Sequence, residues 1–117
     1  MKVLSVRYCT VNANAEPLAK FFDALGLPRK AGNAVGSSGT FTGAIFVAAE
    51  NWIEVWPTDS GMAEQVILQI VVDDADAFAA RARDHGLHPQ GPVNAHGERI
   101  YFLKAPTGLQ ISIQSST

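Results

Sequence analysis

The chain of 117 residues repeats one order of elements, and this repeat constrains its fold more than any other feature. Each half reads as a strand, a helix and then a run of strands. The two helices end alike, at Leu25-Gly26-Leu27-Pro28 and at His85-Gly86-Leu87-His88-Pro89, with an offset of 60 residues between the glycines. A repeat of this length predicts two similar units that bury a common core. We therefore expect an α+β fold in which two βαβββ modules share one sheet, with a cleft where the modules meet.

The repeat also predicts where one module ends and the next begins. We place the first module at residues 1–57, a short linker at residues 58–61, and the second module at residues 62–117. The last three residues, Ser115–Thr117, follow the final strand and are expected to fray.

Residues 29–40 are the stretch with the weakest structural signal. Gly32, Gly36 and Gly39 interrupt it, and glycine weakens a strand. Two interpretations stay open: an exposed loop with a weak edge strand, or a mobile flap over the cleft.

Composition excludes several classes of function. The net charge is -2 and no block of like charge occurs, so neither nucleic acid nor a membrane is an expected partner. The N-terminus has no signal-peptide pattern, which predicts a soluble cytoplasmic protein. The single cysteine, Cys9, excludes an internal disulfide, and we expect it to be a buried, unreactive thiol on the helix-covered face.

Alternation along the strands predicts which side chains avoid the helix-covered core. Residues 52–56 alternate between apolar Ile53 and Val55, expected in the core, and the residues between them. The opposite face of the sheet is predicted to carry aromatic, amide and hydroxyl groups and one carboxylate. Its expected members are Tyr8, Thr10, Trp52, Glu54, Trp56, Gln69, Gln110, Ser112 and Gln114. This face is either open to water or the wall of a concave site for an aromatic or amphipathic ligand.

Several stretches of the second half have the form of a known superfamily. They are Val71-Val72-Asp73-Asp74 before the helix, Gly97-Glu98-Arg99-Ile100-Tyr101-Phe102-Leu103, and the turn Ala105-Pro106-Thr107-Gly108-Leu109-Gln110-Ile111. With the doubled element order, they resemble the vicinal oxygen chelate superfamily, which includes glyoxalase I, extradiol dioxygenases and bleomycin-resistance proteins. The resemblance covers nearly the whole chain. It implies that the two modules form a curved mixed sheet around a cavity, so that the polar face lines a cup. It also implies that the protein forms a homodimer, with the linker as a hinge for exchanging modules.

The resemblance also implies where a metal ion would bind. Metal-dependent members place four ligands at positions that fall here on Val6, Glu54, Ile67 and Ser112. Glu54 alone among these is a good ligand for a divalent ion. We therefore expect no metal and no other cofactor.

These observations favour a metal-independent protein that binds a small aromatic or cationic molecule, an antibiotic included. Trp52 and Trp56 would stack on the ligand, and Glu54 would pair with a ligand cation or with Arg7 or Arg99 of the protein. Hydrogen bonds would come from other polar residues of the face. The candidate ligand-binding residues are Tyr8, Trp52, Glu54, Trp56, Gln69, Tyr101, Gln110 and Ser112.

Two alternatives stay open. One is a metal-dependent lyase, isomerase or dioxygenase of the same superfamily with a degenerate metal site. The other is a domain whose cavity is filled by its own side chains.

Overall fold

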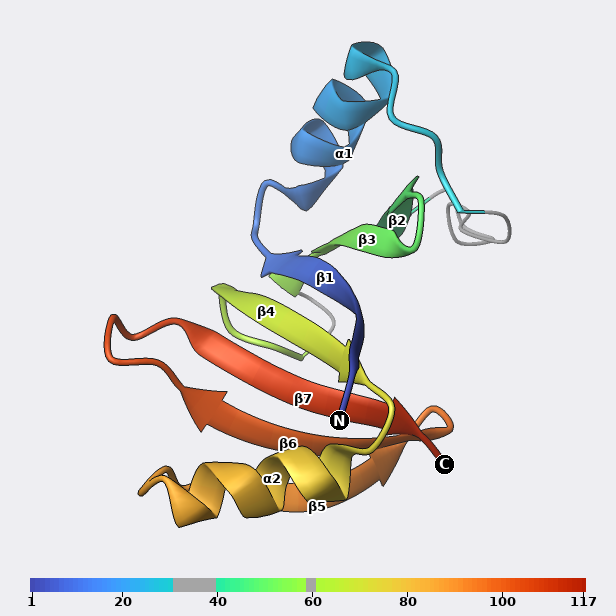
Figure 1. Ribbon diagram of the computed structural model, residues 1–117. Helices are drawn as coiled ribbons and strands as arrows, with labels where there is room; N and C mark the ends of the chain where they lie inside the picture. The colour runs from blue at the N-terminus through green and yellow to red at the C-terminus, as the bar shows by residue number, and fades with distance from the viewer. Residues whose placement is uncertain (31–39, 59–60) are drawn as a thin grey trace. The chain divides into compact units, whose positions relative to one another are not determined.

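The computed structural model describes residues 1–30, 40–58 and 61–117, whose helices and strands are those of an α+β protein (Figure 1). Parallel and antiparallel strand pairs both occur, so the predicted α+β class with mixed sheet is confirmed. No helix in this part of the chain is long and apolar enough to cross a bilayer. In chain order the described elements are β1 (Val3–Val11), α1 (Ala15–Leu25), β2 (Ala44–Ala48), β3 (Asn51–Trp56), β4 (Gln65–Val72), α2 (Ala75–Asp84), β5 (Gln90–Ala95), β6 (Glu98–Lys104) and β7 (Gln110–Ser116).

The chain divides into two compact units that do not follow a simple division into halves. The first unit consists of residues 7–66, and the second consists of residues 1–6 together with residues 67–117. Strand β1 therefore gives its first residues to the second unit and its last residues to the first.

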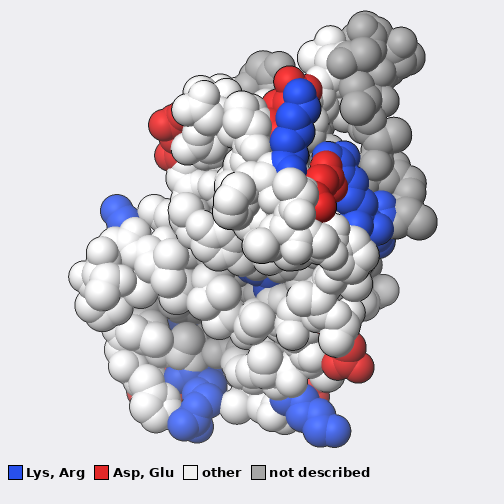
Figure 2. All heavy atoms as spheres, turned by 90° about the horizontal axis from the view of Figure 1, so that it is seen from above, with Lys and Arg blue, Asp and Glu red and all other residues white. Residues whose placement is uncertain are grey.

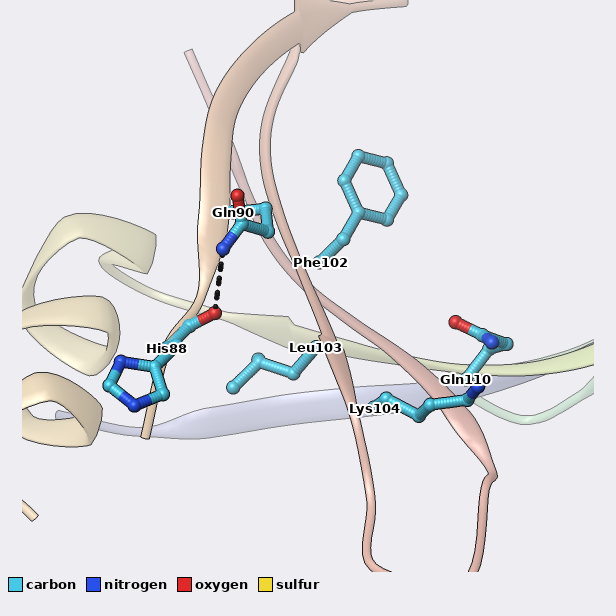
Figure 3. A pocket seen from close by; sticks show the side chains of 6 residues that line it. All are labelled: His88, Gln90, Phe102, Leu103, Lys104 and Gln110. Atoms are coloured by element: carbon cyan, nitrogen blue, oxygen red, sulfur yellow. Dashed lines mark hydrogen bonds between the residues drawn. The ribbon is translucent and has the colours of Figure 1, made fainter. Parts of the chain in front are cut away.

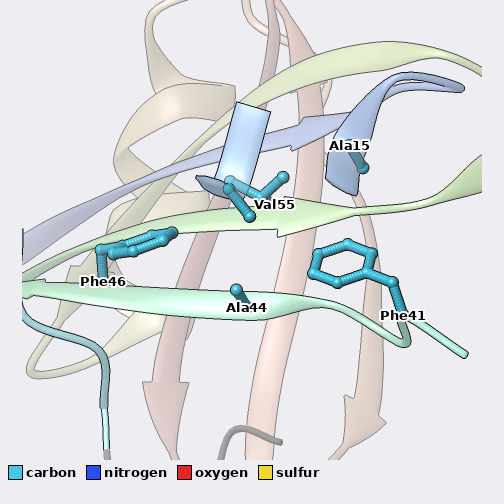
Figure 4. Packing of buried hydrophobic residues seen from close by; sticks show 6 residues of the cluster. Ala15, Phe41, Ala44, Phe46 and Val55 are labelled. Atoms are coloured by element: carbon cyan, nitrogen blue, oxygen red, sulfur yellow. The ribbon is translucent and has the colours of Figure 1, made fainter. Parts of the chain in front are cut away.

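In the first unit, strand β3 lies between β2 and β1. It pairs in parallel with β1 and antiparallel with β2. Alanines on α1 and β2 let the helix approach the strands closely, and two phenylalanine rings fill the remaining space (Figure 4). Phe46 is fully buried, and its burial contributes about 1.5–3 kcal/mol to the free energy of unfolding. The buried cluster is Ala15, Ala19, Phe41, Ala44, Phe46 and Val55.

The end of α1 has the geometry that its sequence predicts. Gly26 adopts a left-handed conformation (φ 101°), and its N–H donates to the carbonyl of Asp23. The next residue, Leu27, donates to the carbonyl of Phe22 and packs against the core. The helix therefore stops where glycine allows the chain to turn back toward β2.

The segment after α1 lies along the outer edge of β2. Lys30 donates its N–H to the carbonyl of Ile45 at 2.8 Å, and Val47 donates to the carbonyl of Pro28 at 2.9 Å. These bonds fix the position of Lys30 beside the strands. The rest of the predicted edge strand or flap, residues 31–39, lies outside the described residues.

In the second unit the strand order is β4-β7-β6-β5, and α2 packs on β6 and β7. The Asp74 side chain accepts a hydrogen bond from the N–H of Ala77 at 3.1 Å, which makes it the N-cap of α2. The helix buries Ala75 and Ala79 against Val72 and Tyr101. Asp74 therefore starts the helix.

Residues near the N-terminus are held by the second unit. The N–H of Lys2 donates to Oδ1 of Asp73 at 2.9 Å, and the N–H of Asp73 donates to the carbonyl of Lys2 at 3.1 Å. This reciprocal pair attaches the beginning of β1 to the segment just before α2.

The prediction that Ser115–Thr117 frays is wrong. Strand β7 continues to Ser116, and the buried hydroxyl of Ser115 accepts a hydrogen bond from the N–H of Ala75 at 3.0 Å. The N–H of Thr117 donates to the carbonyl of Gly97 at 2.9 Å. Both bonds join residues distant in sequence, so local composition could not indicate them.

Candidate functional site

The candidate site in the first unit starts from the side of β3 that faces away from α1. Ile53 and Val55 pack into the core with the helix, as their alternation predicts. Trp52, Glu54 and Trp56 therefore share the opposite side of the strand. The two tryptophans are half-buried, whereas Glu54 is only 8% exposed.

The structure corrects the predicted facing of β1. Paired residues of neighbouring parallel strands point to the same side, and β1 pairs Arg7 with Trp52 and Cys9 with Glu54. Tyr8 and Thr10 therefore point to the α1 side, so the prediction that they share the face of Glu54 is wrong.

The reason for this error is that β1 does not alternate clearly between apolar and polar residues. Both of its faces carry apolar and polar side chains, so periodicity alone cannot choose between them. The repeat does hold the missing signal. The 60-residue offset between the helix ends makes Arg7 the counterpart of Ile67 and Cys9 the counterpart of Gln69. The strand pairs agree with this match, because Cys9 pairs with Glu54 in the first half as Gln69 pairs with Ser112 in the second.

Glu54 and Trp56 are directly bonded. The indole Nε1–H of Trp56 donates to Oε1 of Glu54 at 3.0 Å. The ring of Trp56 also lies against Gly43, where a side chain's Cβ would come within 2.2 Å of a ring carbon. Gly43 has φ +131°, a conformation that favours glycine. Backbone geometry at Gly43 therefore sets the position of the indole that holds the buried carboxylate.

Trp52 lies between two cationic groups. The guanidinium carbon of Arg7 is 3.8 Å from the centroid of the indole ring, and Nζ of Lys30 is 3.9 Å from it. Arg7 comes from β1 on one side of β3, and Lys30 comes from the edge beyond β2 on the other side. Both contacts are cation–π interactions. Sequence reasoning missed this arrangement, because Lys30 and Arg7 are far from Trp52 along the chain.

Cys9 faces the same side as Glu54, not the helix-covered side as predicted. It is buried, and burial first, with the charge of Glu54 second, raises the pKa of its thiol to about 12. A thiol with this pKa is protonated at neutral pH and is a poor nucleophile. The expectation of a buried, unreactive thiol is therefore supported, although its facing was wrong.

The second unit carries a polar face on β4 and β7. Strand pairing places Gln69 opposite Ser112 on one side of the sheet, with Gln110 and Gln114 on the same side, as predicted. The hydroxyl of Ser112 donates to Oε1 of Gln114 at 2.7 Å, and Nε2 of Gln114 donates to Oε1 of Glu98 at 3.0 Å. Ser112 and Gln114 are buried, so this chain of hydrogen bonds satisfies polar groups that water does not reach.

Tyr101, also predicted to bind ligand, lies on the other side of the sheet. It is paired with Ile113 and packs in the core against α2. Its hydroxyl donates to Oδ1 of Asp76, which also accepts a bond from Nε of Arg99 at 2.6 Å. Tyr101 therefore attaches α2 to β6 and does not lie on the side of the sheet that carries Ser112.

The positions that the resemblance assigns to metal ligands do not fit a divalent ion. The repeat offset replaces Val6 by Arg7 as the counterpart of Ile67, and none of these three side chains is a ligand for such an ion. Ser112 is a neutral hydroxyl that donates its hydrogen bond to another side chain. Among the residues that the structure describes, no three His, Cys, Asp or Glu side chains come together. These positions offer only one carboxylate, that of Glu54, which is too few ligands for the divalent ion that the family mechanism uses.

Comparison with known proteins relates the chain to others through its structure. No protein-family model and no curated protein sequence matches the chain. A glyoxalase/bleomycin resistance protein/dioxygenase superfamily member from Vibrio splendidus 12B01 is similar with a TM-score of 0.66 and 12% identity, over 98% of this chain and 100% of that one.

Two further structures extend this similarity. Methylmalonyl-CoA epimerase from Mycobacterium tuberculosis matches with a TM-score of 0.60 and 18% identity, over 98% of this chain and 87% of that one. A protein named as an NAD-dependent benzaldehyde dehydrogenase from Legionella pneumophila matches with a TM-score of 0.64 and 13% identity, over 96% and 99%. Similarity at these identities shows the fold alone. The predicted resemblance is confirmed at that level: the chain has the fold of the glyoxalase/bleomycin resistance protein/dioxygenase superfamily.

Proposed function

We propose that the protein binds a small organic anion, without a metal ion, on the face of the first unit that carries Arg7, Lys30 and Trp52. The observation that carries the proposal is the pair of cations at 3.8 and 3.9 Å from the centroid of one indole ring. Two cationic groups that converge on one aromatic side chain form a local positive field. Aromatic acids combine the negative charge and the flat apolar surface that this face complements.

The charges at Trp52 favour an anion over the cation that the sequence suggested. Two unit charges 4 Å apart interact by about 1 kcal/mol in water and about 4 kcal/mol near a protein surface. A ligand cation beside Trp52 would meet that repulsion from Arg7 and from Lys30. Glu54, which is 8% exposed and accepts the Trp56 N–H, places one negative charge on the same side of β3 against the two positive charges.

Trp52 then acts as a positioning residue. Arg and Lys side chains each lose about 2 kcal/mol of rotamer entropy when they are fixed. Contact with the indole holds both in place before the ligand arrives, so less of that entropy remains to be lost on binding. We infer that the ligand contacts the two cations, while its ring packs against apolar surface beside them.

Charged residues elsewhere do not suggest a macromolecular partner. On the face that Figure 2 shows, Lys and Arg are scattered, some beside Asp or Glu and others separated by uncharged surface. A surface of this kind lacks the continuous basic patch that binds a phosphate backbone. Sequestering a toxic molecule, an antibiotic included, needs binding alone, and this role is consistent with the poor fit of Val6, Ile67 and Ser112 to a metal ion.

Calorimetric titration with three ligands of similar size tests the proposal. Benzoate should bind more tightly than benzyl alcohol, and benzylamine should bind most weakly. Lys30→Gln and Arg7→Gln should each weaken benzoate binding about tenfold, because each removes a charge-assisted contact. Lys20→Gln changes an exposed lysine on α1 and is the matched control, with no expected effect. Preference for benzylamine over benzoate would contradict the proposal.

Metal analysis separates this proposal from the enzymatic alternative. The purified protein should contain far less than one divalent ion per chain, and EDTA should leave benzoate binding unchanged. One tightly bound divalent ion per chain, together with turnover of a catechol or a hemithioacetal, would overturn the metal-independent function.

A further inference from the structure

The second unit contains a hollow whose lining, among the described residues, includes no residue of the Trp52 face. It lies on the side of the sheet that carries Ser112, which is the strand partner of Phe102. Its volume is about 290 Å³ (Figure 3). Two amides, one aromatic ring, one aliphatic side chain and two basic side chains surround it. The lining residues are His88, Gln90, Phe102, Leu103, Lys104 and Gln110.

Strand pairing explains why these groups converge. Phe102 on β6 pairs with Gln90 on β5, and Lys104 pairs with Gln110 on β7. Phe102 and Lys104 are two residues apart, so all four side chains share one side of the sheet. Three neighbouring strands thus present a ring, a cation and two amides to the same space.

We propose that this hollow binds a planar heterocycle that carries an anionic substituent, the chemistry of a nucleoside monophosphate. Phe102 is 42% exposed, which leaves ring surface on which a base can stack. Stacking of a base on an aromatic side chain contributes about 1–3 kcal/mol. A phenyl ring so exposed gains apolar burial when a flat ligand covers it.

The two amides suit the edge of a heterocycle. A side-chain amide has both donors and an acceptor, which match the adjacent acceptor and donor on an adenine edge. Gln90 is held in position because its Nε2 donates to the carbonyl of His88 at 3.2 Å (Figure 3). Gln110 supplies the second amide from the neighbouring side of the hollow. Neither amide is needed to recognise a simple aryl acid, so this ligand class differs from that proposed for the first unit.

The charge and the volume of the hollow also suit a nucleoside monophosphate. Among the described residues that line the hollow, none carries a carboxylate, whereas Lys104 carries a positive charge. An ammonium group binds phosphate as a point charge. The volume lies just below the range of about 300–1,000 Å³ for small-molecule sites. A hollow of this size favours a mononucleotide over the larger dinucleotide.

Three probes titrated into the whole 117-residue chain test this inference: AMP, adenosine and ribose 5-phosphate. AMP should bind most tightly, with adenosine and ribose 5-phosphate each at least tenfold weaker. Phe102→Ala should weaken AMP and adenosine about tenfold alike. Lys104→Gln should lower the affinity for AMP to that for adenosine, and should leave adenosine binding unchanged.

Two matched variants control for general effects of charge and surface. Phe21→Ala removes a ring that is 60% exposed on α1, and Lys20→Gln removes an exposed charge on the same helix. Neither should change AMP binding. Equal affinity for AMP and ribose 5-phosphate, or equal loss in Phe21→Ala and Phe102→Ala, would overturn the inference, as would an absence of AMP binding at millimolar concentration. Arg7→Gln should weaken benzoate binding and leave AMP binding unchanged. The proposal for each site can therefore be refuted without affecting the other.

Discussion

Trp56 donates its indole N–H to the carboxylate of Glu54, two residues earlier on the same strand, at 3.0 Å. The second unit contains the same relationship in other chemistry, where Ser112 donates to Gln114 two residues later on β7. Both bonds lie on the side of the sheet that faces away from the local helix. In each unit, the last strand therefore satisfies its own buried polar group, and a metal ion is not needed for that purpose.

Replacing Trp56 by Phe tests the value of this bond. The variant keeps an aromatic ring and removes the donor to a carboxylate that is 8% exposed. We expect the free energy of unfolding to fall by about 1–2 kcal/mol, because a charged acceptor loses a hydrogen bond. Urea denaturation of wild type, Trp56→Phe, Glu54→Gln and the double variant forms a double-mutant cycle. Additive losses would show that the two residues do not interact energetically.

Gly43→Ala should displace the ring of Trp56. The added Cβ would lie 2.2 Å from a ring carbon, and φ of +131° is strained for alanine. We expect a loss of about 2–4 kcal/mol in the free energy of unfolding and a red shift of Trp56 emission, measured in a Trp52→Phe background. Gly108→Ala is the matched control, because its φ is +89° and no atom lies within 4 Å of the new Cβ. It should cost about 1 kcal/mol and leave the emission unchanged. Equal effects of both variants would contradict the close contact.

Stability at high pH should depend on Cys9. Its pKa in the folded protein is about 12, above the ordinary value of 9.0, so the folded state holds the thiol proton more tightly than the unfolded state does. This contribution is complete below pH 9 and is lost as the pH rises toward 12, by up to about 1.4 kcal/mol per pH unit. Denaturation of wild type and Cys9→Ala between about pH 8 and 11 should give curves that converge or cross as the pH rises. Parallel curves would refute the shift.

Stability at low pH should depend on Asp76. Hydrogen bonds from Arg99 and then from Tyr101 lower the pKa of this carboxyl below its ordinary value of 3.8. The resulting stabilisation is present above pH 3.8 and is lost as the pH falls through the lower pKa of the folded state. Asp76→Asn should therefore show less acid sensitivity than wild type in denaturation series from about pH 2.5 to 6. Tyr101→Phe should give an intermediate profile. Identical acid sensitivity of Asp76→Asn and wild type would rule out this role.

Several parts of the fold follow from local sequence. The end of α1 was predictable because Gly26 supplies a left-handed cap, and the start of α2 was predictable because Asp74 is a good N-cap. The facing of β3 was predictable because Glu54 lies between Ile53 and Val55. In each case, a few neighbouring residues contain the whole physical reason.

Other parts depend on contacts between distant residues. The predicted facing of β1 was wrong because both sides of the strand carry similar residues. The pairing of β1 with β3 decides which side faces α1. The order of Ser115–Thr117 depends on Ala75 and Gly97, which lie far away in the chain.

The same limit applies to the candidate site. The two tryptophans and Glu54 were recognisable as unusual, but the cations at Trp52 were not. Their contact exists only because β1 and the edge beyond β2 flank β3. The sign of the charge that a ligand should carry therefore required the structure.

The division of β1 between two units has a consequence for how the chain assembles during translation. Residues 1–6 leave the ribosome before residues 67–117, to whose unit they belong. Residues 7–66, by contrast, have all the members of their unit as soon as residue 66 has emerged. The first unit is thus free to form cotranslationally, while Lys2 must wait for Asp73 before it gains its hydrogen-bond partner. Residues 1–6 are therefore synthesised before both helices but are among the last residues to reach their native position.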